Sequence, residues 1–485
     1  MHGAAYALAG TDQNMPGNDD YFSMRALAAT AGSDHTRTMA RRVVRGMIAS
    51  GAWGVRPACV AGCNCAEALY ETTATTAAHQ SLARHVAAAS VVLLKNDERV
   101  LPLRGAGCDR DATPAAGGTC VASRRVVIVG SACFAPPLSA ETAARDWTAS
   151  DYFTVGGSGR VIAARADPVG DALRTALTAA GAEVTIIADD DAGAALTSMR
   201  GAAVAIACGG ATGGEASDRP SLRLDQHDFL VDLGDISAAA RADSAGAGAT
   251  QVDAVARLVV IAFAPGSIDA AWANHANAAA VMFPGGEASA AAWVDVLTGH
   301  VAPSAKLPVT LHSPATPETH PCTGQRCEYI EGVHVGWRAL HDDPVAYPFG
   351  HGLSYTTWTY AWSQRPTPTR RLPSGPIRPA DADADAMVAN MSVVITNAGS
   401  TPGAEVVQLY LRFPPAAAQP PIVLRGFSKT PLLAPGAVHV ARFELSARGV
   451  STWADGWRPM GGTFGAVVGG SSRDARLGAE LRLAP

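Results

Sequence analysis

The stretch that decides the fold is Ala-Val-Ala-Ile-Ala-Cys (residues 203–208), followed after a short link by Gly-Gly-Glu-Ala-Ser-Asp-Arg (residues 213–219). The first string is continuously apolar, which is typical of a strand buried on both faces of a parallel sheet. The second string places a carboxylic acid, Glu215, in a polar loop at the carboxyl end of that strand. Open α/β sheets bind ligands at this edge, so the sequence predicts a site around Glu215.

Short apolar runs alternate with helical patterns on both sides of this stretch, over residues 125–299. Further strands are predicted at residues 126–129, 184–188, 258–264 and 279–283. Asp167 and Pro168 predict the start of a helix between two of them, because they match an N-cap and a first-turn proline. The alternation predicts a mostly parallel sheet with helices on both faces.

The two ends of the chain differ from this central part in composition and periodicity. Residues 1–56 are mostly helical in pattern, with residues 38–50 the clearest amphipathic stretch. Residues 365–385 are rich in Pro, Arg and Asp without periodicity, which predicts a linker. Beyond this linker, short alternating runs at residues 391–395, 406–411, 438–445 and 464–468 predict a small β-sandwich.

Charge and hydropathy exclude two classes of partner. The formal net charge is -5, and no basic cluster is interleaved with aromatic residues, so we expect no nucleic-acid binding. No apolar run approaches the roughly 20 residues that a membrane-spanning helix requires. The N-terminus lacks the basic region of a signal peptide, so no such peptide is predicted in this chain.

The nine cysteines form local groups, which indicates disulfides and an oxidising compartment. The groups are Cys59, Cys63 and Cys65; Cys108 and Cys120; and Cys322 and Cys327. Zinc is the alternative for the first group, although no fourth ligand lies at the usual spacing. Cys133 and Cys208 stand alone at the ends of apolar runs, and we expect both to be buried free thiols.

Five longer strings stand in order along the chain: AGTDQNMPG (9–17), AAASVVLLKND (87–97), SAKLPVT (304–310), EGVHVGWR (331–338) and YPFGHGLSYT (347–356). Together they resemble glycoside hydrolase family 3, the β-glucosidase and β-xylosidase group. The resemblance implies five parts: the C-terminal remnant of a (β/α)8 barrel at residues 1–57, whose last strand and loop are residues 9–17; a linker at 58–85; an α/β sandwich domain at 86–312; a connecting segment at 313–385; and a fibronectin type III-like β-sandwich at 386–485.

By the same resemblance, Glu215 is the general acid/base of a retaining glycosidase. The family pattern is Glu-Gly-x-Asp-Arg, and this chain keeps its spacing with Ala216 in place of glycine and with Asp218 and Arg219 supporting the loop. Retaining enzymes use two carboxyl groups about 5 Å apart, one as acid/base and one as nucleophile. The alternative interpretation makes Glu215 a solvated loop residue beside an ordinary Asp218–Arg219 surface pair.

The nucleophile that the resemblance implies is an aspartate in a Ser-Asp-Trp string, and this sequence contains no such string. Asp12 belongs to the later Met-Pro-Gly loop and does not replace it. We therefore expect this chain to be the larger C-terminal part of a secreted, retaining β-glucosidase that cleaves terminal non-reducing β-D-glucosyl residues, and to be weakly active or inactive alone. The alternatives are a β-xylosidase and a non-catalytic carbohydrate-binding relative.

Other motifs are interpreted structurally. Gly156–Gly159 resembles a phosphate loop but lacks the following Lys and Ser/Thr, so we expect a flexible turn. Gly285–Glu287 is expected to be a structural turn, and His334 and His351 are expected to pack or hydrogen-bond, because no second metal ligand lies at suitable spacing. Asn390 begins a glycosylation tripeptide. No cofactor or metal is predicted, the expected partner is a β-glucoside or oligosaccharide, and neither substrate-binding residues nor an oligomeric state follow from the sequence.

Overall fold

The computed structural model describes residues 5–14, 22–53, 75–105, 107–108, 117–163, 165–215, 218–245, 254–319, 322, 326–378, 385–454 and 456–484. The chain divides into two compact units, Met1–Thr76 and Ala77–Pro485. Cys59, Cys63 and Cys65 lie outside the described residues, so their predicted disulfide or zinc chemistry stays a prediction.

The first unit is helical where it is described. It contains α1 (Ala5–Leu8), α2 (Met24–Thr30) and α3 (Gly32–Ala49), packed through Ala7, Leu27 and Met39. The strand expected within residues 9–17 does not form in the described part, residues 9–14, which is a turn followed by irregular backbone. A barrel strand is stable only when neighbouring strands satisfy its backbone hydrogen bonds, and none is present in the described residues of this unit.

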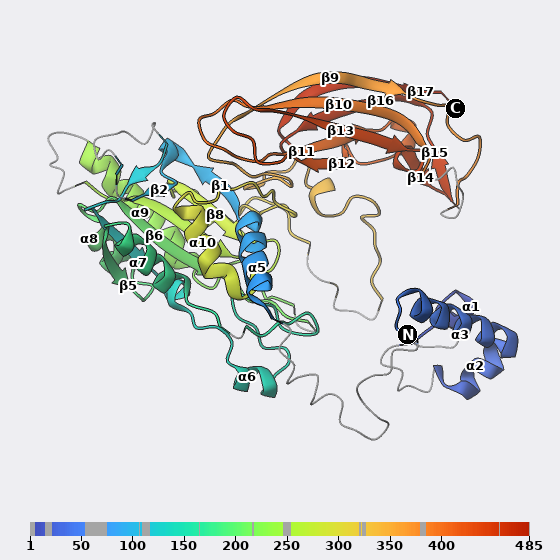
Figure 1. Ribbon diagram of the computed structural model, residues 1–485, viewed down its shortest axis with the longest axis horizontal. Helices are drawn as coiled ribbons and strands as arrows, with labels where there is room; N and C mark the ends of the chain where they lie inside the picture. Colours follow the sequence, from blue (N-terminus) through green and yellow to red (C-terminus); the bar gives the residue numbers. More distant parts are fainter. Residues whose placement is uncertain are drawn as a thin grey trace. The chain divides into compact units, whose positions relative to one another are not determined.

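The second unit begins with an α/β domain built on a six-stranded sheet (Figure 1). The strands, in spatial order, are β1 (Val92–Asn96), β8 (Ala278–Met282), β7 (Arg257–Phe263), β6 (Val204–Gly210), β4 (Arg125–Val129) and β5 (Glu183–Ile187). All neighbours run parallel except β1, which pairs antiparallel with β8. The predicted mostly parallel sheet is thus confirmed.

Helices bury both faces of this sheet, which explains why β6 and β7 are continuously apolar. One face packs against α5 (Ala77–Ser90), α7 (Val169–Ala179) and α10 (Ser289–Leu297), and the other against α8 (Ala192–Met199) and α9 (His227–Ala245). Outside these layers lie α6 (Ala140–Arg145) and a small parallel pair, β2 (Leu103–Arg104) and β3 (Thr119–Cys120). The helix α5 begins at Ala77, inside the segment expected to be a linker.

A β-sandwich follows, as predicted (Figure 1). Its three-stranded sheet has the order β13 (Val438–Ser446), β10 (Met387–Asn397), β9 (Trp358–Pro368), and its four-stranded sheet has the order β12 (Val423–Lys429), β11 (Val406–Arg412), β16 (Gly462–Gly469), β17 (Ala475–Leu483). A hairpin of β14 (Ser451–Trp453) and β15 (Trp457–Pro459) is attached. The sandwich takes in β9, whose residues were expected in the connecting segment. This strand lies at a sheet edge, where prolines such as Pro368 are tolerated.

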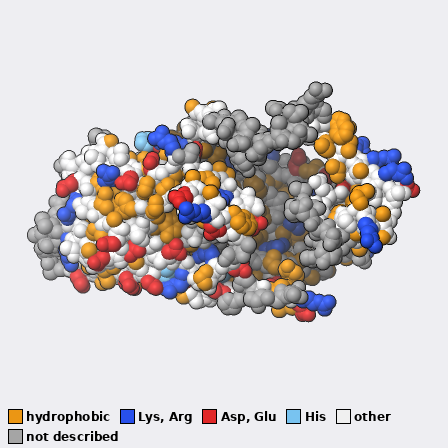
Figure 2. Space-filling model, turned by 90° about the horizontal axis from the view of Figure 1, so that it is seen from below, with side chains coloured by type: hydrophobic (Ala, Val, Ile, Leu, Met, Phe, Trp, Pro, Cys, Tyr) orange, Lys and Arg blue, Asp and Glu red, His pale blue; other side chains and the backbone are white. Residues whose placement is uncertain are grey.

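The surface mixes side chains of every kind. On the face drawn in Figure 2, acidic and basic side chains are interspersed with apolar ones. Within the described residues, no helix is both long enough and apolar enough to span a bilayer.

The expectation of free thiols at Cys133 and Cys208 is wrong, because the two residues form a disulfide. Cys133 follows β4 and Cys208 lies on β6, and these strands are neighbours in the sheet, so their side chains meet although 75 residues separate them. Sequence spacing could not reveal this proximity. The predicted local pairs do form, as Cys108–Cys120 and Cys322–Cys327.

Replacing Cys133 and Cys208 with alanine is expected to lower the free energy of unfolding by about 4 kcal/mol, because the crosslink closes a long loop in the unfolded chain. The matched variant that removes Cys108 and Cys120, which are 12 residues apart, should cost less, about 3 kcal/mol. Urea unfolding of the three proteins measures both effects. A Cys133/Cys208 variant as stable as the parent would contradict the crosslink.

One buried ion pair joins the α/β domain to the sandwich. The Nζ of Lys306 lies 2.8 Å from Oε1 of Glu405, and the two side chains are 13% and 5% exposed. Lys306 also donates a hydrogen bond to the carbonyl of Gly352 at 2.7 Å. Removing one member of such a pair leaves the other charge buried without its counter-ion.

The variant Glu405→Gln is therefore expected to destabilise the protein by about 3 kcal/mol. Glu141→Gln breaks the ion pair with Arg145, whose members are 73% and 78% exposed, and should cost less than about 1 kcal/mol. Thermal and urea unfolding compare the two variants. Equal losses would mean that burial of the Lys306–Glu405 pair has no energetic consequence.

Candidate active site

Glu215 lies where the sequence places it, in the loop that leaves the carboxyl end of β6 and leads to α9. We name residues 211–224 the Glu215 loop. Its neighbour is a second loop, residues 152–160, which we name the donor loop. Gly156 and Gly214 form a parallel bridge between the two. The amide of Gly156 donates to the carbonyl of Gly213 at 3.0 Å, and the amide of Glu215 donates to the carbonyl of Gly156 at 3.1 Å.

The donor loop also holds the catalytic candidate's carboxylate. The backbone amide of Ser158 donates to Oε2 of Glu215 at 2.7 Å. The hydroxyl of Ser158 and then this amide hold the pKa of Glu215 below its ordinary value, because both bonds favour the ionised form. Glu215 is exposed in this chain. It is therefore an anion at neutral pH.

Glycine is required at the contact between the loops. Gly157 has φ of 100°, and a Cβ there would lie 2.3 Å from Cβ of Glu215 and 2.8 Å from its Oε2. The sequence interpretation of Gly156–Gly159 as a flexible turn missed this role. The glycines themselves were the available signal, since close backbone approach is one reason for glycine in a loop.

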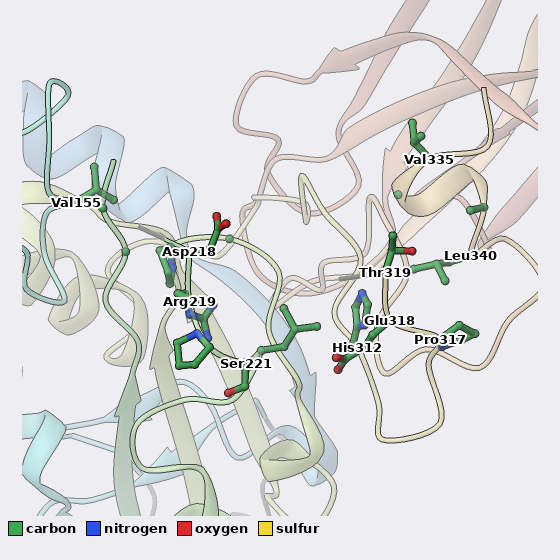
Figure 3. A pocket seen from close by; sticks show the side chains of 18 of the residues that line it. Val155, Asp218, Arg219, Ser221, His312, Pro317, Glu318, Thr319, Val335 and Leu340 are labelled. Atoms are coloured by element: carbon green, nitrogen blue, oxygen red, sulfur yellow. The ribbon is translucent and has the colours of Figure 1, made fainter. Parts of the chain in front are cut away.

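The two loops form one wall of a pocket of 880 Å³. In Figure 3, Asp218, Arg219 and Ser221 of the Glu215 loop lie on one side, and His312, Glu318 and Thr319 lie on the other. Glu331 and His334, from one of the diagnostic strings, also line it. The pocket thus collects residues from segments more than 100 positions apart.

Asp218 and Arg219 are both brought to the pocket, but they are not the surface pair of the alternative interpretation. Arg219 is half-buried and donates to the carbonyls of Arg223 at 2.8 Å and Ser267 at 3.3 Å, so it braces the loop. Burial lowers the pKa of Arg219 from its ordinary value, although the guanidinium remains charged. Asp218 is exposed at the pocket wall.

The histidines of the region divide into three environments. His351 is half-buried, its Nε2 lies 2.8 Å from the carbonyl of Leu94, and desolvation lowers its pKa, so it has the expected hydrogen-bonding role. His334 is exposed at the pocket instead of packed. His312, which the sequence interpretation did not single out, forms part of the opposite wall, and burial lowers its pKa so that the imidazole is neutral at pH 7.

Two further candidates lie away from this pocket. Asn390 is in β10, between Thr367 and Glu444 of the neighbouring strands, and its Oδ1 accepts a bond from Nε2 of Gln364 at 2.7 Å. Its glycosylation stays a prediction. A Cβ at Gly285 would lie 2.8 Å from Sδ of Met282 and from Oγ of Ser289, so the backbone of this turn packs closely, and its structural role stays a prediction. Across the described residues, no group of three or more His, Cys, Asp or Glu side chains is placed to hold a metal ion.

Comparison with known proteins assigns both domains. Residues 91–355 match the glycosyl hydrolase family 3 C-terminal domain, and residues 405–472 match the fibronectin type III-like domain. The chain belongs to glycosyl hydrolase family 3. The family assignment from the sequence strings is confirmed.

The family relatives are longer than this chain. It is 35% identical to probable beta-glucosidase D of Aspergillus niger over 55% of this chain and 35% of the relative. It is 30% identical to probable beta-glucosidase L of Neosartorya fischeri over 98% of this chain and 64% of the relative. Beta-D-glucoside glucohydrolase from Trichoderma reesei matches in structure with a TM-score of 0.81 and 26% identity, over 100% of this chain and 67% of that one. The chain thus spans roughly one to two thirds of the relatives' length.

The variant Gly157→Ala tests the contact between the loops. The added methyl group cannot fit beside Glu215, so the carboxylate should leave the Ser158 amide and its pKa should rise toward the ordinary value. Carboxyl-carbon NMR titration of the 485-residue chain measures this pKa. Gly159→Ala, where a Cβ meets nothing within 4 Å, is the matched control. An unchanged pKa in Gly157→Ala would contradict the described contact.

Proposed function

We propose that this chain carries the acid/base half of a retaining β-glucosidase site, with Glu215 as the general acid/base. The observation that supports this most directly is the convergence of Glu215, Asp218 and Arg219 on one pocket at the carboxyl edge of a parallel sheet. The relatives that are named beta-glucosidases supply the substrate class, a terminal β-D-glucosyl residue. Asp218 and Arg219 are proposed to support the loop.

The reaction proposed for this site has two steps. In the first step, Glu215 gives a proton to the leaving oxygen while a second carboxylate attacks the anomeric carbon. In the second step, Glu215 takes a proton from the water that hydrolyses the glycosyl–enzyme ester. We propose that the second carboxylate belongs to the part of the longer relatives that this chain does not span. The Ser-Asp-Trp string that would carry it is absent from this sequence.

The exposure and the lowered pKa of the Glu215 carboxyl group are consistent with a site that lacks some of its parts. A general acid must be protonated near the working pH, and glycosidases achieve this by placing the carboxyl group in an apolar pocket. Here the carboxyl is exposed and its pKa is lowered by Ser158. Enclosure by a further domain would remove water from the carboxyl and raise its pKa.

The compartment is a related proposal. Three disulfides lie within the described residues, which is typical of proteins that fold in oxidising compartments. We therefore propose that the protein is secreted.

The test is hydrolysis of an aryl β-glucoside by this chain and by a longer form, in which the chain is extended with the barrel domain that the proposal requires. The chain alone is expected to show weak or no turnover. In the longer form, Glu215→Gln should lower kcat at least a hundredfold, because general acid–base catalysis contributes about 10²–10⁴. Glu141→Gln, an exposed residue of the same domain, should have no effect.

Other outcomes point elsewhere. Vigorous turnover by the 485-residue chain alone would refute the proposed division of the site. Turnover restricted to an aryl β-xyloside would assign a β-xylosidase. Glucoside binding without turnover would assign a carbohydrate-binding protein, provided that Glu215→Gln leaves the binding unchanged.

A further inference from the structure

Tyr152 is the first residue of the donor loop. Its ring stacks on Phe263 of β7 with centroids 6.2 Å apart. Gly210, the last residue of β6, lies against the same ring, because a Cβ at Gly210 would be 2.6 Å from Tyr152 Cδ1. The Tyr152 ring is thus fixed against the ends of the two strands that flank the Glu215 loop.

The base of the Glu215 loop is closed by the residues that follow it. The amide of Asp225 donates to the carbonyl of Gly210 at 2.8 Å. The amide of Gly210 donates to Oε1 of Gln226 at 3.0 Å, and Gln226 is 8% exposed. These bonds bring the beginning and the end of the loop together, although residues 211–224 separate them.

The Tyr152 hydroxyl connects the donor loop to this closure. It donates to Oδ2 of Asp225 at 2.9 Å and accepts from Nε2 of Gln226 at 3.1 Å. Burial raises the pKa of Tyr152 to about 12, so the hydroxyl keeps its proton at neutral pH and remains a donor. One oxygen atom therefore binds the two residues that directly follow the Glu215 loop.

The network continues into the sheet. Nε2 of Gln226 also lies 3.3 Å from the hydroxyl of Ser131, which follows β4. Asp190, which follows β5, accepts from the hydroxyl of Ser131 at 2.7 Å and from its amide at 2.8 Å. The closure of the Glu215 loop is thereby anchored to the ends of two further strands.

We propose that Tyr152 is a positioning residue for Glu215, whose hydroxyl sets the register between the donor loop and the Glu215 loop. Tyr152 does not touch the carboxylate. It acts by holding the loop that offers the Ser158 amide against the loop that carries Glu215. The consequence for catalysis rests on the proposed function, whereas the positioning is a property of this chain itself.

The test replaces the hydroxyl alone. Tyr152→Phe keeps the ring contacts with Phe263 and Gly210 and removes both hydrogen bonds. Tyr355→Phe is the matched control, because the Tyr355 hydroxyl donates one partly buried hydrogen bond, to the carbonyl of Val296 at 2.8 Å, in the same domain and away from the site. Asp225→Asn gives a second way to weaken the connection if Tyr152→Phe folds poorly.

The first readout is the Glu215 pKa in the 485-residue chain, measured by carboxyl-carbon NMR. Tyr152→Phe and Asp225→Asn should raise it toward the ordinary value, and Tyr355→Phe should leave it unchanged. The second readout is the longer enzyme, in which Tyr152→Phe should lower kcat roughly ten- to a hundredfold with KM changed less than about twofold, as expected for a misplaced catalytic group.

The proposal is overturned if the Glu215 pKa is unchanged in both Tyr152→Phe and Asp225→Asn and their loss of Tm equals that of Tyr355→Phe. Tyr152 would then be a purely structural residue. Failure of the proposed function gives a different result. In that case Glu215→Gln leaves hydrolysis unchanged, while the response of the Glu215 pKa to Tyr152→Phe can still be measured.

Discussion

The contact between two glycine-rich loops at the edge of the parallel sheet is the constraint on which this site depends. Backbone bonds join Gly156 to Gly213 and Glu215, and the Ser158 amide then reaches the Glu215 carboxylate. Such close approach of two backbones excludes a side chain at Gly157. The position of the carboxylate is therefore set by main-chain geometry, which is stiffer than contacts between flexible side chains.

The ends of the sheet strands give these loops their fixed supports. The order of the parallel strands, β8-β7-β6-β4-β5, changes direction between β6 and β4, because the chain passes from β4 outward to β5 before returning to β6. At this switch point the loops diverge, which leaves a crevice in open α/β sheets. Here the Cys133–Cys208 disulfide and the Tyr152–Gln226–Ser131 hydrogen bonds link β6 and the residues after its loop to the end of β4. These links support the adjacent Glu215 loop.

Much of this fold could be predicted from sequence because local patterns determine it. Short apolar runs such as 258–264, which is followed by proline and glycine, are typical of a strand covered on both faces, and Glu215 follows such a run. The features that were missed depend on contacts between distant segments. The Cys133–Cys208 disulfide, the approach of Gly157 to Glu215 and the Tyr152 hydroxyl bonds all join residues at least 57 positions apart. The strand β9 was missed because its prolines resemble those of a linker, and only its edge position makes them acceptable.

The central claim is that Glu215 donates a proton to the leaving group. The most direct test is how the loss in kcat/KM caused by Glu215→Gln depends on the acidity of the leaving group. In a form of the chain extended with the barrel domain that the proposed function requires, Glu215→Gln should be compared with the parent on aryl β-glucosides of graded leaving-group pKa. The account predicts a small loss in kcat/KM for a dinitrophenolate, which departs without a proton, and a loss that grows as the leaving group becomes more basic. A loss of the same size for every leaving group would contradict the role of Glu215 as general acid.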